Sequence, residues 1–205
     1  MIETQEKILA TAERLFGEQG YAATSLRHII AEAGVNLAAI HYHFGSKEDL
    51  LDQLVMRRAA PVNTERLAML DRLEAEPGGP PSVEKVLEAF LEPPFRRISE
   101  FPDLIKLMGR LYGEGLMTVI GEKHFHNVAI RFLAALGRAL PHLSQAELRL
   151  RGQLVLGAMS HTMFYVPVSG SKASVDGAVL LRELIVFLSG GLRAPAVLPE
   201  RIEEK

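Results

Sequence analysis

Apolar residues along the chain recur at spacings of three and four, which is the period of amphipathic α-helices. No stretch has the strict apolar–polar alternation of a half-buried strand, so the pattern predicts an all-α protein. The head of the chain shows the period most clearly, with Ile8, Ala12, Leu15 and Phe16 on one face. The predicted helices cover residues 3–19, 24–34, 36–41, 46–60, 62–74, 82–93, 103–116, 121–141, 144–166 and 175–189.

Capping residues and helix breakers set the expected ends of these helices. Ser46 with Asp49 and Ser144 with Glu147 have the spacing of capping boxes, and Ser82 is placed to cap another helix start. Proline removes a backbone donor and glycine favours a left-handed cap, so both are expected where helices stop. The expected breaks are at Gly20, Gly34, Pro61, residues 77–81 (PGGPP), Pro93, Pro94, Pro141, Gly190 and Gly191.

Composition narrows the function classes. The chain has 205 residues, of which 48% are hydrophobic and 23% charged, and it has no cysteine. Disulfides, thiolate metal sites and cysteine nucleophiles are therefore excluded. His124 and His126 are two residues apart, which puts them on different sides of a helix and makes a poor metal clamp. No nucleophile elbow, zinc-protease motif or phosphate loop is present, so we expect no catalytic residue, no metal and no cofactor.

The sequence predicts neither a membrane span nor a secretory signal. Its richest apolar run, AVLLRELIVFL, is interrupted by Arg182 and Glu183, and the N-terminal MIETQEK lacks an apolar run. We therefore expect a cytoplasmic protein with no membrane partner.

The stretch VNLAAIHYHF, residues 35–44, has the features of a DNA-binding helix-turn-helix. Gly34 provides a sharp turn and Asn36 caps a short helix, whose Ile40 and Phe44 share a core-facing side. The face formed by Leu37, Ala38 and His41 suits a groove floor. Tyr42 and His43 carry donors for phosphate oxygens, and Lys47 stands in the first turn of the next helix, where a phosphate partner would suit it.

Charge complicates this interpretation. The net charge is −2, and residues 1–60 contain six Lys or Arg against eight Asp or Glu. DNA affinity must then come from a local face of the head. Taken singly, Tyr42, His43 and Arg27 are each compatible with ordinary surface positions.

The segment GYAATSLRHIIAEAGVNLAAIHYHFGSKEDLLDQL closely resembles the N-terminal domain of the tetracycline-repressor (TetR) family of transcriptional regulators. The resemblance implies a three-helix DNA-binding head over residues 1–46, with the recognition helix near residues 36–41. It departs at Ala38-Ala39, where a glycine is often found, and at His41, where an aromatic is frequent. Combining pattern and resemblance, the candidate DNA-binding residues are Thr24, Ser25, Arg27, Asn36, Leu37, Ala38, His41, Tyr42, His43 and Lys47.

Residues 47–205 are expected to form a helical body for dimerisation and effector binding. Its last two long helices are apolar on more than one side, so each must be buried on several sides. Pairing them with their copies in a second subunit would form a four-helix interface, and the resemblance implies the same homodimer.

An apolar effector pocket in this body is implied by the resemblance and by a supply of adaptable side chains. Core filling by these methionines and a structural role for His161 are the simpler alternatives. The stretch GRALPHLSQAELRLRGQLVLGAMSHTM also resembles a TetR subgroup that includes regulators of fatty-acid metabolism, which makes a fatty acid or acyl thioester the candidate effector. The candidate ligand-binding residues are Phe95, Met108, Tyr112, Phe125, Met159, His161, Met163 and Phe164.

The sequence thus predicts a repressor that binds a palindromic double-stranded DNA operator as a homodimer and is released by a small apolar effector. The helix that follows the head is the expected lever for this switch. Two alternatives stay open: an all-helical enzyme for an apolar substrate with His161 as base, and a dimeric interaction module without DNA binding.

Overall fold

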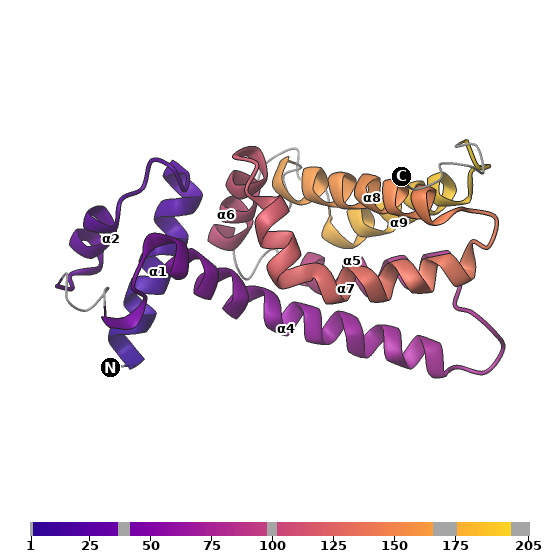
Figure 1. Cartoon of the computed structure of the whole chain (residues 1–205), viewed down its shortest axis with the longest axis horizontal. Coiled ribbons are helices and arrows are strands. Elements are labelled where there is room, and N and C mark those ends of the chain that lie inside the picture. Colours follow the sequence, from indigo (N-terminus) through magenta and orange to yellow (C-terminus); the bar gives the residue numbers. More distant parts are fainter. Residues whose placement is uncertain (1, 37–41, 98–101, 166–175, 198–205) are drawn as a thin grey trace, which may run out of the picture. The chain divides into compact units, whose positions relative to one another are not determined.

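The computed structural model describes residues 2–36, 42–97, 102–165 and 176–197, and these ranges contain eight α-helices and no strand (Figure 1). The all-α prediction is confirmed. The helices are α1 (Ile2–Gln19), α2 (Leu26–Ala33), α4 (Lys47–Ala75), α5 (Val83–Arg96), α6 (Pro102–Gly113), α7 (Met117–Ala139), α8 (Gln145–Tyr165) and α9 (Gly177–Arg193).

The chain folds as two compact units. Unit 1 comprises Met1–Val62 and Ile98–His126, and unit 2 comprises Asn63–Arg97 and Asn127–Lys205. Helices α4 and α7 each contribute residues to both units. Unit 1 therefore contains more than the predicted head, because α6 and the first half of α7 pack with it; the boundary at residues 46–47 stays a prediction.

The core of unit 1 is built from the apolar faces predicted for the head. Ile8, Phe16, Ile29 and Leu50 have no exposed surface, and Phe44 is only 4% exposed, as predicted. Leu107 and Leu111 of α6 and Ile120 of α7 belong to the same cluster. Helix α6 comes very close to α1 at Gly17, where an added Cβ would lie 3.1 Å from the Asp103 carbonyl oxygen and 3.2 Å from the Leu107 nitrogen.

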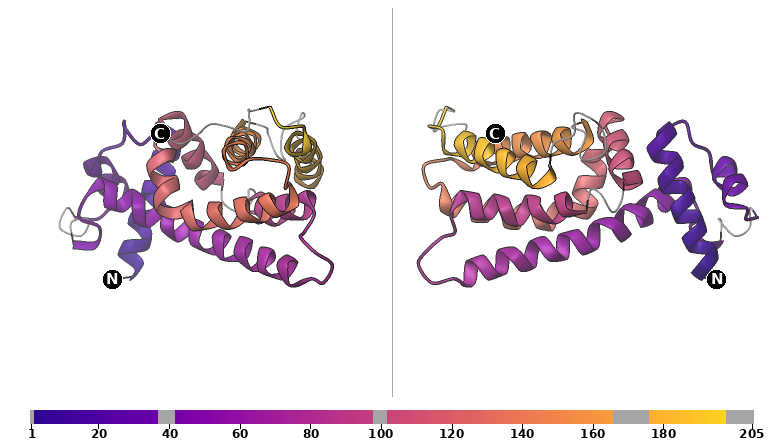
Figure 2. Two further views of the ribbon diagram at one scale, coloured as in Figure 1. Left: turned by 45° about the vertical axis from the view of Figure 1, so that its right-hand side comes forward. Right: turned by 180° about the vertical axis from the view of Figure 1, so that it is seen from behind.

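In unit 2, α9 packs along α5 and lies beside α8 (Figure 2). The buried face of α5 follows helical spacing, with Val83, Val86, Leu87 and Leu91 each exposed by 2% or less. Helices α8 and α9 also carry large apolar side chains that the single chain leaves exposed. None of the helices formed by the described residues is long and apolar enough to cross a membrane.

The predicted break at Pro61 is wrong, because α4 runs through it from Lys47 to Ala75. A proline inside a helix leaves the carbonyl four residues earlier, here that of Arg57, without its N–H partner. Arg57 and Pro61 are both exposed, so water can satisfy that carbonyl. The helices predicted over residues 46–60 and 62–74 are therefore one, with buried Val55, Ala59 and Leu70 on the same apolar stripe.

Pro93 and Pro94 were also expected to end or kink a helix, but both lie inside α5, which continues to Arg96. Pro94 cannot donate to the carbonyl of Phe90, and the structure supplies a substitute donor. Arg66 Nε of α4 donates to the Phe90 carbonyl oxygen over 2.7 Å. A side chain distant in sequence thus compensates for the missing backbone bond.

The last helix was predicted to close at Gly190 and Gly191, yet α9 continues to Arg193. Its final carbonyls are held by Arg151 of α8. The guanidinium donates to the carbonyl oxygens of Gly191 (3.1 Å), Leu192 (2.8 Å), Ala194 (2.7 Å) and Pro195 (2.8 Å). These bonds satisfy the acceptors that every helix end leaves free, so the glycines need not terminate the helix.

Several predicted caps are confirmed. Ser82 Oγ accepts from the Lys85 backbone N–H and Ser144 Oγ from that of Glu147. At the other end of the chain, Ser46 Oγ accepts from Asp49 N over 3.0 Å while the Asp49 carboxylate accepts from Ser46 N over 3.3 Å. This reciprocal pair is the capping box expected at the start of α4.

Candidate nucleic-acid interface

The turn that follows α2 has the geometry expected of a helix-turn-helix. Ser25 caps the start of α2 by accepting from His28 N over 3.1 Å. Gly34 ends it in the left-handed conformation, with φ at 64°, which an L side chain rarely adopts. Its N–H bonds back to the carbonyls of Ala31 and Ile30, so the chain turns sharply before exposed Asn36.

After the turn, the structure separates core from surface as the sequence predicted. Phe44 is buried, whereas the neighbouring Tyr42 side chain is 77% exposed. The His43 ring meets the Tyr42 ring edge-on at 5.1 Å between centroids, which favours a fixed orientation of both donors. The predicted base-reading residues Leu37, Ala38 and His41, and also Ile40, lie outside the described residues.

Lys47 is the first residue of α4, and Tyr21 holds its side chain. The ammonium lies 4.1 Å from the centroid of the Tyr21 ring, a cation–π contact. Burial of Tyr21, together with the charge of Glu48 and a hydrogen bond to it, raises the pKa of Tyr21 to about 12. The phenol therefore stays neutral, and Lys47 stands at a helix N-terminus whose free N–H groups already favour an anion.

Ion pairing explains how an acidic head can present a basic face. Four of its basic side chains are paired with carboxylates, and Asp52 is paired with Lys123 of α7 over 2.8 Å. The pairs within the head are Lys7 with Glu3 at 2.9 Å, Arg14 with Glu18 at 3.1 Å and Glu32 at 2.8 Å, Arg57 with Glu6 at 2.5 Å, and Arg58 with Glu13 at 2.5 Å.

Two basic side chains of the head, Arg27 and Lys47, have no carboxylate partner among the residues that the structure describes. Arg27 is exposed on α2, and Lys47 is half-buried at the start of α4. These two cations, with Ser25, Tyr42 and His43, stay the candidates for a local DNA-contacting face. The other four basic side chains among residues 1–60 are paired with carboxylates of the same segment.

Thr24 does not fit the phosphate contact expected of it. The residue is 1% exposed, and its hydroxyl donates to the carbonyl oxygens of Gly20 (2.8 Å) and Leu15 (3.3 Å). Its backbone N–H is also taken, by Tyr21 O at 3.3 Å. Thr24 therefore braces the end of α1, and the neighbouring Ser25 is the exposed member of the pair.

Two residues of α6 and its C-terminal turn contact the candidate DNA-binding region, and no local sequence pattern indicates either contact. Arg110 Nη2 donates to the Glu18 carbonyl oxygen at the end of α1 over 3.2 Å. The Glu114 carboxylate accepts from the backbone N–H groups of Tyr21 (3.0 Å) and Ala22 (3.1 Å). These contacts attach α6 to the turn that sets the entry to α2.

The predicted effector residues fall into both units. In unit 1, Met108 and Phe125 pack against the core cluster, which favours the core-filling alternative, and Tyr112 is 47% exposed. In unit 2, Phe95 and Met163 are buried and Phe164 is half-buried.

The two remaining candidates in unit 2 have different surroundings. His161 is exposed on α8 of the single chain, contrary to the interior position that the pocket prediction required. Met159 contacts a charged group, with its Sδ 3.7 Å from Arg66 Nη2. Arg66 is a further candidate that could not be predicted, because nothing in the local sequence pattern indicates that an arginine would be buried there.

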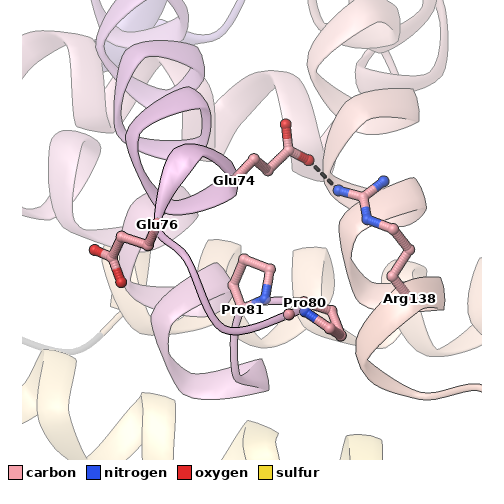
Figure 3. A pocket seen from close by; sticks show the side chains of 6 residues that line it. Glu74, Glu76, Pro80, Pro81 and Arg138 are labelled. Atoms are coloured by element: carbon pink, nitrogen blue, oxygen red, sulfur yellow. Dashed lines mark hydrogen bonds and ion pairs between the residues drawn. The ribbon is translucent and has the colours of Figure 1, made fainter.

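One surface depression of about 700 Å³ lies where α4 ends and α7 approaches its own end (Figure 3). Its lining includes Glu74, Glu76, Pro80, Pro81 and Arg138. The Glu74 carboxylate is paired with Arg138, and Glu76 turns away toward Lys85, 2.7 Å from it. This is a charged, open hollow rather than the predicted apolar cavity. Across the described ranges no three His, Asp or Glu side chains are grouped to hold a metal ion.

Comparison with known proteins gives two family matches. Residues 8–54 match the model described as "Bacterial regulatory proteins, tetR family". Residues 88–191 match the model described as "Tetracyclin repressor-like, C-terminal domain". The first match contains the turn, Tyr42 and Lys47, and the second spans α5 to α9.

Similar proteins agree with these matches. The chain is 46% identical over 52 residues to the transcriptional regulator AcrR of Shigella flexneri and 52% identical over 48 residues to the dual regulator CecR of the same organism. The alignments span only 24% and 21% of those two relatives. The solved structure of the fatty acid degradation regulator FadR from Bacillus halodurans aligns with a TM-score of 0.69 over 93% of this chain and 96% of that one, at 20% identity, which shows a shared fold.

Proposed function

The chain belongs to the TetR family of bacterial regulatory proteins, and from that premise we propose that it is a ligand-responsive repressor that binds a palindromic operator as a homodimer. The family consists of DNA-binding transcriptional regulators, so DNA recognition and transcriptional control are its general role. The operator form, the dimer and the effector are our proposals for this chain. A DNA-binding regulator acts where the chromosome is, so the proposed location is the cytoplasm.

The observation that carries the DNA-binding proposal is the selective pairing of charges in the head. Carboxylates pair with the other four basic side chains, while Arg27 and Lys47 have no carboxylate partner among the described residues, and Tyr42 is 77% exposed. We propose phosphate contacts for Ser25, Arg27, Tyr42, His43 and Lys47. Asn36 stays the predicted cap of the recognition helix, and Leu37, Ala38 and His41 stay the predicted base-reading face.

The homodimer proposal is supported by the exposed apolar side chains of α8 and α9. Monomeric proteins rarely leave such a patch open to water, and two long helices from each subunit would cover it as a four-helix bundle. Twofold symmetry then places two recognition helices about 34–36 Å apart, one turn of DNA. The side chains concerned are Leu150 (47% exposed), Leu154 (64%), Leu156 (42%), Val179 (46%), Val186 (62%) and Phe187 (76%).

We propose that a small apolar effector, with a fatty acid or acyl thioester as the candidate, releases the protein from DNA. The response would reach the head through α6, because Arg110 and Glu114 bond directly to the end of α1 and the turn after it. An effector acts only through different affinities for the DNA-bound and released states. The enzyme alternative names His161 as its base, and in the single chain this residue is exposed on α8.

The DNA-binding proposal is tested by electrophoretic retardation of the DNA upstream of the protein's own reading frame, at several salt concentrations. Lys47→Ala should weaken binding to all sequences and lower the salt slope by about 1, because one phosphate contact is lost. Tyr42→Phe should weaken binding without changing that slope. Lys7→Ala is the control, since Lys7 is already paired with Glu3. Unchanged binding and slope in both test variants would contradict the contact assignment.

The dimer proposal is tested by sedimentation of a Phe187→Glu variant. A charge in the centre of an apolar interface costs several kcal/mol, so this variant should sediment as a monomer and bind a palindromic site poorly. Ile130→Glu is the matched control, because Ile130 is 52% exposed but lies on α7. A Phe187→Glu protein that stays dimeric would remove α9 from the interface.

A further inference from the structure

Arg66 is a buried cation in the interior of unit 2. It lies in the part of α4 that belongs to this unit, and only 3% of the residue is exposed. Arginine is almost never fully buried unless it is paired. Its surroundings therefore call for an explanation of both its hydrogen bonds and its charge.

The hydrogen bond of the Arg66 Nε is explained by the fold. The Phe90 carbonyl oxygen would receive an N–H from residue 94 in an ordinary helix, but residue 94 is proline. Arg66 Nε donates there instead, over 2.7 Å. This bond accounts for Nε and leaves the edge formed by Nη1 and Nη2 to other partners.

The positive charge of Arg66, unlike its Nε hydrogen bond, is not matched by a charged partner in the described part of the chain. Among the described residues, the hydrogen-bond partners of the Nη edge are the Asn63 Oδ1 atom at 3.3 Å and the Met159 Sδ atom at 3.7 Å, both of them neutral acceptors. In the described part of the chain no carboxylate lies within ion-pair distance of Arg66, although more exposed arginines of the same unit, such as Arg131, are paired. Burial lowers the pKa of Arg66 to about 9, because removing the guanidinium from water disfavours its charged form.

Besides Asn63, the side chains that contact the guanidinium are aromatic and thioether groups. The Phe90 ring lies 4.2 Å from the Arg66 Cζ atom, a cation–π contact, and the Phe132 ring packs against Phe90 with 5.0 Å between centroids. Met159, beside Nη2, is half-buried and unbranched, so it can change rotamer and uncover the Nη edge. An entering molecule would thus meet one positive charge in an apolar setting.

We propose that Arg66 is the anion-binding residue of an effector site, and that its ligand is a monocarboxylate with an apolar body whose carboxylate is held by the Nη1 and Nη2 edge of the guanidinium. The proposal rests on the proposed function, in which the body of the chain, residues 47–205, binds an effector. It also narrows the expected effector to a molecule with a free carboxylate, because a purely apolar molecule would leave the buried charge unmatched.

The charge balance favours a carboxylate over a phosphate monoester. The planar Nη edge of a guanidinium matches the two oxygens of a carboxylate in a bidentate geometry. One carboxylate neutralises one guanidinium. A dianionic phosphate would leave a buried negative charge uncompensated, since Arg66 is the cation found buried in the described interior of unit 2.

The test is calorimetric titration of the full-length protein with decanoate, 1-decanol and decyl phosphate. Wild-type protein should bind decanoate more tightly than 1-decanol by at least about tenfold, because a charge-assisted bidentate pair is lost with the alcohol. Decyl phosphate should bind more weakly than decanoate. The Arg66→Met variant keeps the apolar volume and should lose the preference for decanoate. Arg72→Met, on the exposed side of α4, should keep it.

The comparison of decanoate with 1-decanol on wild-type protein needs no variant, so it decides the question even if Arg66→Met fails to fold. Equal affinity for acid and alcohol, or a preference retained by folded Arg66→Met, overturns the proposal. A preference for decyl phosphate also overturns the carboxylate assignment. DNA retardation by ligand-free wild-type protein is measured alongside: retardation without a decanoate preference removes only the Arg66 site, whereas a decanoate preference without retardation removes the DNA-binding proposal.

Discussion

Replacing Gly17 by alanine tests the close approach of α1 and α6 in unit 1. An alanine Cβ at this position would lie 3.1 Å from Asp103 O and from Lys106 Cβ, and 3.2 Å from Leu107 N. Two of these three atoms are backbone atoms of α6, so they cannot move away by a side-chain rotation. The helix itself has to shift by a few tenths of an ångström.

Two opposing contributions set the size of the effect. Alanine is more favourable than glycine inside a helix by about 1 kcal/mol. Overpacking a well-packed contact costs typically about 1–3 kcal/mol. Their sum predicts that Gly17→Ala lowers the free energy of unfolding by about 1 kcal/mol, and that Gly17→Val lowers it further, because the β-branched side chain adds volume and loses rotamers.

The matched control is Gly121→Ala in α7. Gly121 also lies inside a helix, but an added Cβ there meets nothing within 4 Å. Only the helix-propensity contribution remains, so this variant should gain about 1 kcal/mol. Urea unfolding followed by circular dichroism, at one fixed protein concentration, measures both. If Gly17→Ala raises the midpoint as much as Gly121→Ala does, α6 does not approach α1 as described.

Two further predictions concern the end of α9. Arg151→Met removes the hydrogen bonds to four carbonyl oxygens after Gly190 and should lower the free energy of unfolding by about 2 kcal/mol, a total typical of a few hydrogen bonds from a charged donor. Faster amide exchange confined to residues 190–197 would confirm this prediction, and unchanged exchange would contradict it. A hydrogen bond from Arg193 lowers the pKa of Glu84 from 4.5 to about 2. Because the pKa is depressed in the folded state, the stabilisation is complete above pH 4.5 and is lost as pH falls toward 2. Glu84→Gln should therefore flatten the acid-unfolding curve in that window, and an unchanged curve would show that the pair contributes nothing.

Local sequence rules predicted features that depend on residues a few positions apart. Ser25 and Ser82 act at three-residue range on their own helix starts, and the capping box at Ser46 does the same. Phe44 was assigned to the core from the helical period. Each of these interactions joins residues within one helical turn, so the local sequence is enough to predict it.

The wrong predictions are those in which a distant residue compensates for a helix breaker. Pro94 is tolerated because Arg66 supplies the missing donor, and Gly191 continues the helix because Arg151 binds the carbonyls at its end. Both partners lie on other helices, 24 and 41 residues away from the residues they bond. Glu114 could not be predicted for the same reason, because it accepts a hydrogen bond from Tyr21, which is 93 residues away in the sequence.

The sequence indicates that any DNA contact must come from a local basic face of the head, but it does not indicate which basic residues form that face. The sequence contains six cations among its first 60 residues and does not tell which ones carboxylates neutralise. Arg57 and Arg58 come from α4 and pair with Glu6 and Glu13 of α1, a pairing set by packing rather than by spacing. Arg27 and Lys47 become identifiable only when these pairs are known.

The uninterrupted course of α4 through Pro61 has a consequence for how unfolding spreads through the chain. Cooperative opening passes along a helix because each residue shares hydrogen bonds with the next turn, and Pro61 removes one such bond one residue before unit 1 ends at Val62. The other helix that serves both units, α7, has no proline where unit 1 ends at His126. Unfolding of one unit should therefore propagate to the other along α7 more readily than along α4. Although α4 is one continuous helix, its two parts then belong to two different cooperative folding units.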